Sequence, residues 1–508
     1  MTQVKTLLTT ALIGAAAFGL NAGAAAAKDL RIALQEDPDV LDPDQSRTFV
    51  GRIVYASLCD KLVDITPGLE IIPQLATEWE YSEDGMSMTM KLREGVVFHD
   101  GTPFDAEAVA ANIDRSQTLD ESRRKSELKS ITGVEVLGPY EIRFNLAAPD
   151  ATLLAQFADR AGMMMSPTAA AAAGADFGAN PVCSGPFSFG ERVAQDKIVL
   201  NRFADYWNAD AIAFDSVTFV PIPDTTVRLA NLQSGDIDML ERLAPSDIPQ
   251  AESDPNVTVA SEISLGYQGI TFNVNNGERG DTPWGNDSRL RRALSLAVDR
   301  DVINQVVFEN AFAPGNQPFP PNSPWYNTNH PVPARDVEQA RALLAEAGFP
   351  DGIDLEVQVA NANQPQQLMQ VVQSMAAEAG INIKLTAKEF ATLLADQSAG
   401  DYQASQVGWS GRVDPDGNIH QFMTTNGGIN DSKFSDPKVD ELLNAARVST
   451  DQAVRKASYD ASRDILNEAQ PIVYLYHQKL LWALNSKLQG FTAYPDGMIR
   501  LEGVTWAE

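Results

Sequence analysis

Histidine and cysteine are both scarce in this sequence, and their scarcity limits the chemistry that it can support. The chain has 508 residues but only two cysteines and four histidines, which are His99, His330, His420 and His477. The histidines form no H-E-x-x-H, H-x-H or Cys/His pattern, so no ligand set for zinc is present. The G-x-S-x-G elbow of hydrolases and the G-x-x-x-x-G-K-[ST] phosphate loop are also missing. We expect no catalytic residue, no metal and no cofactor, although catalytic groups that meet only in space would leave no such pattern.

Basic residues are few as well. The sequence has 39 lysines and arginines against 68 aspartates and glutamates, a formal net charge of -29 at pH 7. Such a chain repels the phosphates of nucleic acids and gains no electrostatic attraction to anionic lipid. We therefore predict no nucleic-acid partner and interpret the acidic excess as a solubilising surface.

Long apolar runs are confined to the N-terminus. Lys5 is the only charged residue among the first 27, and it is followed by an apolar stretch, 7–20, and by small residues, 22–27. This order is typical of a secretory signal peptide, with cleavage near 25–27. No cysteine lies near that point, which disfavours a lipid anchor, and no later stretch approaches the ~20 apolar residues of a membrane span. We expect residues 1–27 to be a signal peptide and the mature protein to be periplasmic.

The two cysteines, Cys59 and Cys183, can pair if the protein is exported. Two cysteines in an oxidising compartment often form a disulfide. Here the bond would close a loop of more than a hundred residues, which is worth about 4–5 kcal/mol in the chain-entropy account. The alternative is a pair of buried thiols. We favour the disulfide because export is expected.

The most informative stretch of the sequence is residues 88–116. Apolar residues alternate over 88–92, Asp100 and Gly101 supply a turn, and Asp105 can cap a helix whose apolar residues repeat at helical spacing. This order of strand, shaped loop and helix resembles the signature of the family 5 extracellular solute-binding proteins, the receptors of peptide and nickel ABC importers. Residues 73–79, 181–187 and 201–207 resemble further motifs of that family, and the resemblance covers residues 28–508.

The resemblance implies the fold class. It is an α/β, periplasmic-binding-protein-like fold of two lobes with an additional domain (cluster C type), in which mixed β-sheets are flanked by helices. The sequence itself shows a β-α-β unit, because apolar residues alternate over 353–359 and 381–385 and recur at helical spacing between them. The domains implied by the family are domain I at 28–60, 185–265 and 478–508, domain II at 61–184, and domain III at 266–477.

A second loop, residues 406–418, is rich in Gly, Pro and Asp and follows a predicted strand. In it Trp409 offers a flat apolar face, Ser410 and Gly411 offer hydrogen bonds, and Arg412 offers a planar donor fork for a carboxylate. The loop is similar to the family's G-W-[TS]-G ligand loop. Two alternatives stay open: Arg412 can form a surface ion pair with Asp414 or Asp416, and Trp409 can be a core residue.

The loop departs from the family at the positions that hold a dipeptide. Dipeptide receptors usually carry Asp just after this Gly, where Arg412 stands here, and their carboxylate-binding Arg aligns roughly with Gln366. Both changes disfavour a plain dipeptide, unless Asp414 or Asp416 turns into the site. We therefore expect a ligand with an anionic group near Arg412: a modified peptide, an amino-acid conjugate or an opine-like molecule.

Two further segments match positions where the family contacts its ligand. One is the loop after the first strand, with Gln35, Glu36 and Asp37, and the alternative is an ordinary polar turn. The other is Tyr267 and Gln268, and the alternative is that Tyr267 packs in the core.

The resemblance predicts a monomeric receptor that captures a peptide or peptide-like solute and delivers it to the permease subunits of an ABC importer. The ATPase would be a separate chain, which agrees with the missing phosphate loop. A receptor for nickel or a metallophore is an alternative, because His420 lies close to the ligand loop. A secreted hydrolase is an alternative of another class.

Overall fold

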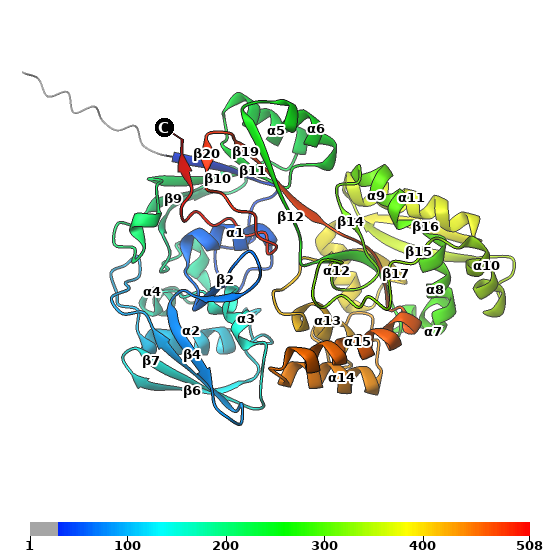
Figure 1. The fold of residues 1–508 in the computed structure, drawn as a ribbon, viewed down its shortest axis with the longest axis horizontal. Coiled ribbons are helices and arrows are strands. Elements are labelled where there is room, and N and C mark those ends of the chain that lie inside the picture. The colour runs from blue at the N-terminus through cyan, green and yellow to red at the C-terminus, as the bar shows by residue number, and fades with distance from the viewer. Residues whose placement is uncertain (1–28, 508) are drawn as a thin grey trace, which may run out of the picture.

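The computed structural model of the protein describes residues 29–507, and the predicted signal peptide, residues 1–27, lies outside the described residues. Figure 1 shows two lobes side by side, with the C-terminus on the lobe that also holds the N-terminal strand. Within residues 29–507, no helix has the length and apolar character needed to cross a membrane.

The first lobe is built on a seven-stranded mixed sheet in the order β12-β19-β11-β1-β10-β9-β8. Its central strand, β1, lies parallel to β10 and β11, and its buried residues, Leu30 and 32–34, are all apolar. The strands are β1 (Asp29–Leu34), β8 (Phe187–Val193), β9 (Lys197–Arg202), β10 (Ser216–Pro221), β11 (Met239–Glu241), β12 (Val257–Ile263) and β19 (Lys479–Asn485). Helices α1 (Phe49–Leu58), α5 (Thr225–Ser234) and α6 (Ile248–Ser253) accompany this sheet, and β20 (Leu488–Gln489) pairs with β21 (Thr505–Trp506).

A four-stranded antiparallel sheet, in the order β4-β5-β7-β6, forms the other part of this lobe. Its strands are β4 (Ala76–Tyr81), β5 (Ser87–Leu92), β6 (Ile131–Gly138) and β7 (Glu141–Leu146), and its helices are α2 (Ala106–Thr118), α3 (Leu153–Phe157) and α4 (Pro167–Ala173). The short strands β2 (Val63–Ile65) and β3 (Ile71–Pro73) form a hairpin at its edge. The predicted strand, turn and helix of residues 88–116 are confirmed, and Asp105 caps α2 by accepting a hydrogen bond from the Ala108 backbone N–H at 2.9 Å.

The second lobe holds a six-stranded mixed sheet in the order β14-β18-β13-β17-β15-β16. Its strands are β13 (Tyr267–Phe272), β14 (Ala313–Pro314), β15 (Ile353–Ala360), β16 (Ile381–Lys388), β17 (Ala404–Trp409) and β18 (Ile472–His477). Its helices are α7 (Pro283–Asn286), α8 (Ser288–Ala297), α9 (Arg300–Phe308), α10 (Val337–Glu346), α11 (Asn363–Glu378), α12 (Phe390–Ala399), α13 (Asp416–Met423), α14 (Pro437–Val448) and α15 (Gln452–Ala469). The predicted β-α-β unit is confirmed, because β15 and β16 pair in parallel and α11 connects them.

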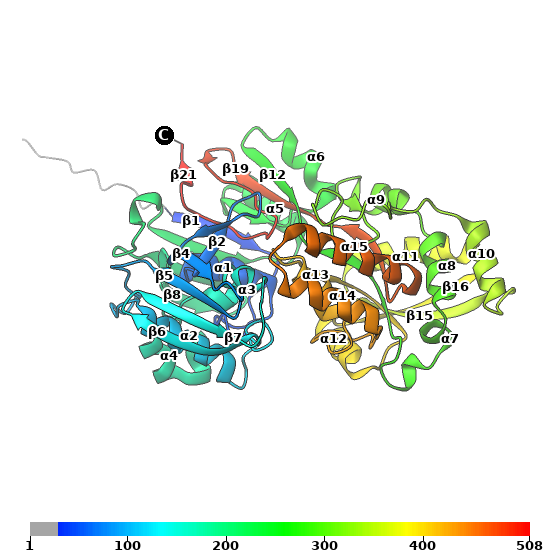
Figure 2. The ribbon, with the colours of Figure 1, turned by 60° about the horizontal axis from the view of Figure 1, so that its bottom comes forward.

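Two stretches of chain connect the lobes. Strand β12 in the first lobe continues into β13 in the second, and β18 returns into β19, as Figures 1 and 2 show. Between them the Ser264 N–H donates to the Gln478 carbonyl at 2.9 Å, and a ring nitrogen of His477 lies 2.7 Å from the Gly266 carbonyl oxygen. We call residues 264–266 and 477–478 the hinge. The three large sheets occupy the three predicted domains, whose boundaries stay a prediction.

Cys59 and Cys183 are joined by a disulfide with sulfur atoms 2.05 Å apart. Both are buried in the core of the first lobe. Cys59 follows α1 directly, and Cys183 lies where the chain returns from the four-stranded sheet to the seven-stranded one. The bond therefore ties the two crossings between domains I and II together.

Candidate ligand-binding site

The loop that follows β17 packs directly on the hinge. Gly411 has a φ of 86°, which an L side chain rarely adopts. A Cβ at Gly411 would collide with the backbone of Leu265, and one at Gly266 would collide with the carbonyl group of Trp409. Glycine is needed at both positions because the loop backbone touches the hinge backbone, and this contact brings Arg412 to the junction of the lobes.

Asn418, from α13, holds the loop in shape. Its side-chain oxygen accepts from the Trp409 indole N–H at 3.0 Å and from the Arg412 backbone N–H at 2.7 Å, and its amide donates to the Arg412 carbonyl at 2.8 Å. The guanidinium of Arg412 lies 4.3 Å from the centre of the Trp409 ring, a cation–π distance. Ser410 between them is exposed. Sequence reasoning gave Asn418 no role, although it lies within the loop of residues 406–418.

Arg412 pairs with the other lobe. Its Nε lies 3.6 Å from a carboxylate oxygen of Asp159, which follows α3 in the first lobe. The predicted alternative, a surface ion pair with Asp414 or Asp416, is wrong. Arg412 is mostly buried, and its side chain is 13% exposed. Burial lowers its pKa to about 10, against the opposing effect of Asp159.

The two nearby aspartates are held by other arginines. Arg455 donates to both carboxylate oxygens of Asp414, at 2.5 and 2.8 Å, in a buried fork-to-fork pair. Arg447 binds both oxygens of Asp416. A ligand ammonium that approached Asp414 would have to displace Arg455, so the prediction that Asp414 contacts the ligand gains no support from this geometry.

Three more arginines gather around Asp159 and its neighbours. Arg52, from α1, donates to Asp159 with Nε at 2.9 Å, and its Nη2 lies 2.9 Å from the second oxygen. Arg160 and Arg124 both donate to the carbonyl of Ser46, at 2.9 and 3.3 Å. We call Arg52, Arg124, Arg160 and Arg412 the arginine cluster.

The arginine cluster shifts the pKa of Asp159 and of its own buried arginines. Burial alone would raise the pKa of Asp159, but Arg52 and Arg412 outweigh it and hold that pKa well below its usual range. Burial, and then the charge of Arg124, lower the pKa of Arg160 to about 9. The carboxylate of Asp159 is therefore ionised at neutral pH, and Arg160 and Arg412 stay charged in spite of their burial.

The loop after β1 offers one available carboxylate. Asp37 forms an ion pair with Arg192 at 2.9 Å and is nearly fully buried, and the Gln35 backbone N–H donates to Glu241 at 2.7 Å. Glu36 is exposed, and its pKa is raised by desolvation against the opposing charge of Arg242. Among these three predicted ligand residues, Glu36 is the acid whose carboxylate is left for a ligand.

The remaining predicted ligand residues lie in the second lobe. Tyr267 is 3% exposed and packs edge-on against Tyr474, with ring centres 4.8 Å apart, and burial raises its pKa well above the usual value. Gln268 accepts from the side-chain amide of Gln406 at 3.2 Å. The amide of Gln366, near the start of α11, donates to a neighbouring asparagine at 3.0 Å. Within residues 29–507, no hydrogen bond or ion pair joins Gln366 to the arginine cluster.

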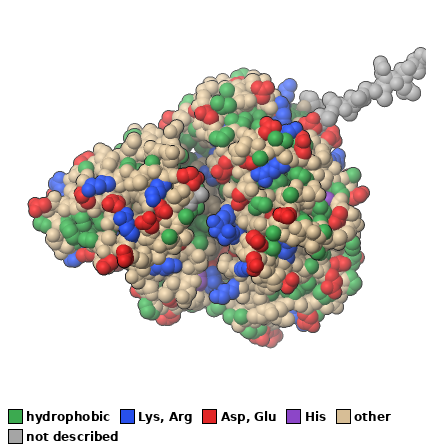
Figure 3. Space-filling model, turned by 180° about the vertical axis from the view of Figure 1, so that it is seen from behind, with side chains coloured by type: hydrophobic (Ala, Val, Ile, Leu, Met, Phe, Trp, Pro, Cys, Tyr) green, Lys and Arg blue, Asp and Glu red, His purple; other side chains and the backbone are tan. Residues whose placement is uncertain are grey.

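The lobes are closed on each other in this structure. The Ala151 N–H of the first lobe donates to the Arg447 carbonyl of the second at 3.0 Å. Val413, next to Arg412, packs on the apolar core of the four-stranded sheet. Figure 3 shows a hollow between the lobes in which Lys and Arg side chains gather. The candidate site is this junction of the lobes, where the loop 409–412 meets Asp159 and Arg52 of the first lobe.

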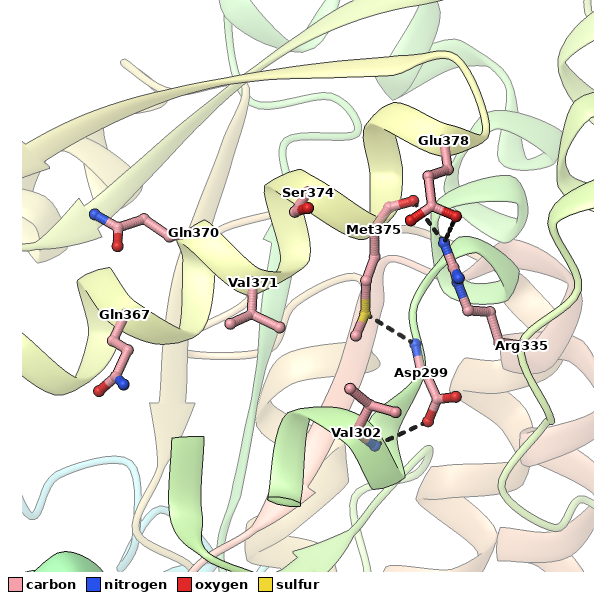
Figure 4. Close-up of a pocket in the computed structure, with 9 residues that line it drawn as sticks. All are labelled: Asp299, Val302, Arg335, Gln367, Gln370, Val371, Ser374, Met375 and Glu378. Carbon is pink, nitrogen blue, oxygen red and sulfur yellow. Dashed lines mark hydrogen bonds and ion pairs between the residues drawn. The ribbon is translucent and has the colours of Figure 1, made fainter. Parts of the chain in front are cut away.

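Other features lie outside the cleft. A pocket of about 480 Å³ between α9 and α11 is lined by Asp299, Val302, Arg335, Gln367, Gln370, Val371, Ser374, Met375 and Glu378, and its Arg335 and Glu378 are paired at 3.0 Å (Figure 4). No predicted ligand residue lines it. His420 lies on α13, 2.9 Å from the side-chain oxygen of Asn444, and burial lowers its pKa. In the part of the chain that the structure describes, no three His, Cys, Asp or Glu side chains form a group that would hold a metal ion.

Comparison with known proteins identifies the family. Residues 70–431 match the profile of the bacterial extracellular solute-binding proteins, family 5. The glutathione-binding protein GsiB of Escherichia coli K12 is 28% identical over 501 residues, covering 96% of this chain and 95% of the relative. The periplasmic binding protein DppA from Helicobacter pylori, solved with the peptide STSA, is 25% identical with a TM-score of 0.84, covering 94% of this chain and 98% of that one. AgaA from A. tumefaciens R10, solved with agropinic acid, is 25% identical with a TM-score of 0.82, covering 94% and 99%.

These similarities extend over nearly the whole chain. They confirm the predicted fold, two lobes of mixed sheets flanked by helices, as that of the periplasmic peptide-binding proteins. The family match alone spans most of the described residues, from just before β3 to just after α13. The chain belongs to family 5 of the bacterial extracellular solute-binding proteins.

Proposed function

We propose that this protein captures a peptide-like solute with a surplus negative charge between its lobes and delivers it to the permease subunits of an ABC importer. Family membership makes the protein a substrate-binding component of such an importer. Its relatives are named or solved with glutathione, a short peptide and agropinic acid, all of which carry carboxylates. The observation that carries the ligand class is the position of Arg412, which faces the first lobe across the cleft and lies close to three other arginines.

The proposed role of each side chain follows from the groups in it that are not already held by another residue. Arg412 binds a ligand carboxylate, with Trp409 stacked on its guanidinium and Ser410 and Gly411 offering further hydrogen bonds. Glu36 holds a ligand ammonium, because Asp414 is occupied by Arg455. The other proposed ligand contacts are made through the peptide backbone or after rearrangement, and they are Gln35, Asp37, Tyr267, Gln268, Gln366 and Asp414.

Closure at the hinge is the proposed activity. A ligand stabilises the closed form only through contacts that the open form lacks. Arg412 and Asp159 lie on different lobes, so a ligand that binds both the loop and the first lobe gains its contacts only on closure. An unmatched polar group in the closed cleft costs about 1–3 kcal/mol, which supplies selectivity.

The rest of the proposal concerns how the protein works in the cell. Residues 1–27 act as a cleaved signal peptide, the mature protein is a periplasmic monomer, and it releases its ligand chemically unchanged. Native mass spectrometry of the protein isolated from the periplasm tests the first two statements through its mass, and mass spectrometry of a ligand recovered after incubation tests the third. A product formed from the ligand would contradict the third statement and favour a hydrolase.

Calorimetry with the Arg412→Ala variant tests the binding site. We expect affinity for a carboxylate-bearing peptide such as glutathione to fall at least about tenfold, or ~1.4 kcal/mol. Arg279→Ala is the matched control, because Arg279 forms an exposed ion pair with Glu356 on the same lobe, and it should bind as the wild type does. Unchanged binding by Arg412→Ala, with any ligand that binds the wild type, would remove Arg412 from the site.

A further inference from the structure

We infer that the arginine cluster is a subsite for two negative charges of the ligand, so that the solute is a dicarboxylate and its charge drives closure of the lobes. This inference rests on the proposed function and specifies its ligand. The cluster has four guanidinium groups, and only two carboxylates pair with them: Asp159, and Glu127, which binds Arg124. Two positive charges are left over.

The surplus charge is buried. Arg52, Arg124 and Arg160 are each 4% exposed, and the side chain of Arg412 is 13% exposed. Buried charges in proteins are normally paired, because removing an ion from water is costly. A protein with a net charge of -29 has many more carboxylates than cations, yet only two carboxylates pair with these four guanidinium groups.

The neighbouring acids do not make up the difference. Asp42 and Asp44 bind Arg115, and Asp496 binds Arg500. Asp42 and Asp44 share one cation, Arg115, and none of the three carboxylates forms an ion pair with an arginine of the cluster.

Two exposed arginines add to the positive charge. Arg47 and Arg123 lie next in the chain to Ser46 and Arg124, and their side chains make no hydrogen bond or ion pair with any described residue.

The cluster also has free donors. Arg52 Nη1, Arg124 Nε and Arg160 Nε are buried nitrogen atoms without a hydrogen-bond partner among residues 29–507. Each can donate a charge-assisted hydrogen bond, and guanidinium groups bind carboxylates through such bonds, often in pairs. Burial, and then the like charges of neighbouring arginines, lower the pKa of Arg160 to about 9.

The cluster is completed only when the lobes close, because Arg412 alone comes from the second lobe. Arg52 belongs to domain I, Arg124 and Arg160 to domain II, and Arg412 to domain III. Closing an empty cleft would bring Arg412 against three like charges that Asp159 and Glu127 balance only in part. A ligand with two carboxylates turns that repulsion into attraction, whereas a neutral ligand of the same shape does not.

Calorimetry and small-angle scattering with probes of different charge test the inference. Glutathione and N-succinyl-alanine carry two carboxylates each, whereas glutathione diethyl ester has none and alanyl-alanine is a zwitterion. We expect the two dicarboxylates to bind at least about tenfold more tightly than the other two, and only they should shrink the radius of gyration. Arg160→Gln should abolish the preference, and Arg279→Gln should keep it.

Every outcome bears on the inference. Tight binding of alanyl-alanine or of the diethyl ester, with closure, would overturn it and leave the receptor function standing. A protein that binds none of the four probes would overturn both. If Arg160→Gln does not fold, Arg124→Gln is the second variant, and the ratio between glutathione and its diester in the wild type decides without any variant.

Discussion

The disulfide between Cys59 and Cys183 gives the sharpest prediction for stability. The two residues are 124 positions apart. In the chain-entropy account, a disulfide that closes a loop of that length lowers the entropy of the unfolded chain and stabilises the folded state by about 5 kcal/mol at 25 °C. Since whole domains are stable by only about 5–15 kcal/mol, the double variant Cys59→Ala/Cys183→Ala should lose a large part of the stability of the first lobe.

The fold around the bond should survive its loss. The Cys183 backbone N–H donates to the ring nitrogen Nδ1 of His99 at 3.2 Å, and the His99 backbone N–H donates to the Cys183 carbonyl at 2.9 Å. The Gly185 N–H donates to the Leu58 carbonyl at 2.8 Å, across the same crossing. These bonds keep the end of α1 against the returning chain, so we expect a folded double variant with a lower unfolding midpoint.

Urea unfolding followed by circular dichroism measures the effect. The wild type under oxidising conditions is the reference, and the double variant should unfold at lower urea with the free energy of unfolding reduced by about 5 kcal/mol. Adding reductant should leave the double variant unchanged and shift the wild type toward it. A double variant within about 1 kcal/mol of the wild type would refute the loop-entropy reasoning for this chain.

Three other predictions test the loop, a helix cap and the hinge. Gly411→Ala should cost about 1–3 kcal/mol of stability and weaken ligand binding, because its φ of 86° and the contact with Leu265 exclude a side chain; unchanged calorimetry would contradict this. Asp436→Ala should lower the free energy of unfolding by about 1 kcal/mol by removing the cap of α14, and Asp436→Asn should restore most of it. His477 is buried, and burial lowers its pKa to about 4 from 6.5, so its neutral form stabilises the fold fully above pH 6.5 and this contribution is lost as the pH falls to 4. The loss amounts to roughly 3 kcal/mol, and His477→Gln should flatten the fall of stability between these pH values in urea titrations.

Individual strands and helices could be predicted from the sequence because their apolar residues recur at the spacing of the buried face. The alternation over residues 88–92 matches Met88, Met90 and Leu92 pointing into the core, and the cap at Asp105 is present. The β-α-β unit of β15, α11 and β16 follows from periodicity in the same way. Side chains repeat with the period of the element that buries them, so one stretch of sequence is sufficient evidence.

Ion pairs between the two lobes could not be predicted from the sequence. From the sequence, the alternative to ligand binding by Arg412 is an ion pair with Asp414 or Asp416, its nearest acids, whereas the structure pairs it with Asp159. Asp159 is remote in the chain and reaches Arg412 only because the hinge brings two separately folded lobes together. Asn418 was missed for another reason: an amide that bonds a loop backbone has no spacing pattern, and only its place after a Gly- and Asp-rich loop could have indicated it.

The arginine cluster and the net charge of -29 act at different ranges, and this difference bears on how an anionic solute is captured. At physiological ionic strength charges are screened over about 8 Å, so the acidic surface repels an approaching dicarboxylate only weakly and the buried cluster cannot attract it from afar. Selection must then occur after encounter, when closure places the ligand against Arg52, Arg160 and Arg412 and removes water from all of them. Added salt should accordingly raise the association rate slightly, by screening the acidic surface, and change the dissociation rate little, because the contacts that it would have to weaken are enclosed. Stopped-flow fluorescence with glutathione at two salt concentrations separates the two rates, and a dissociation rate that rose steeply with salt would mean that the ligand's carboxylates stay exposed to solvent.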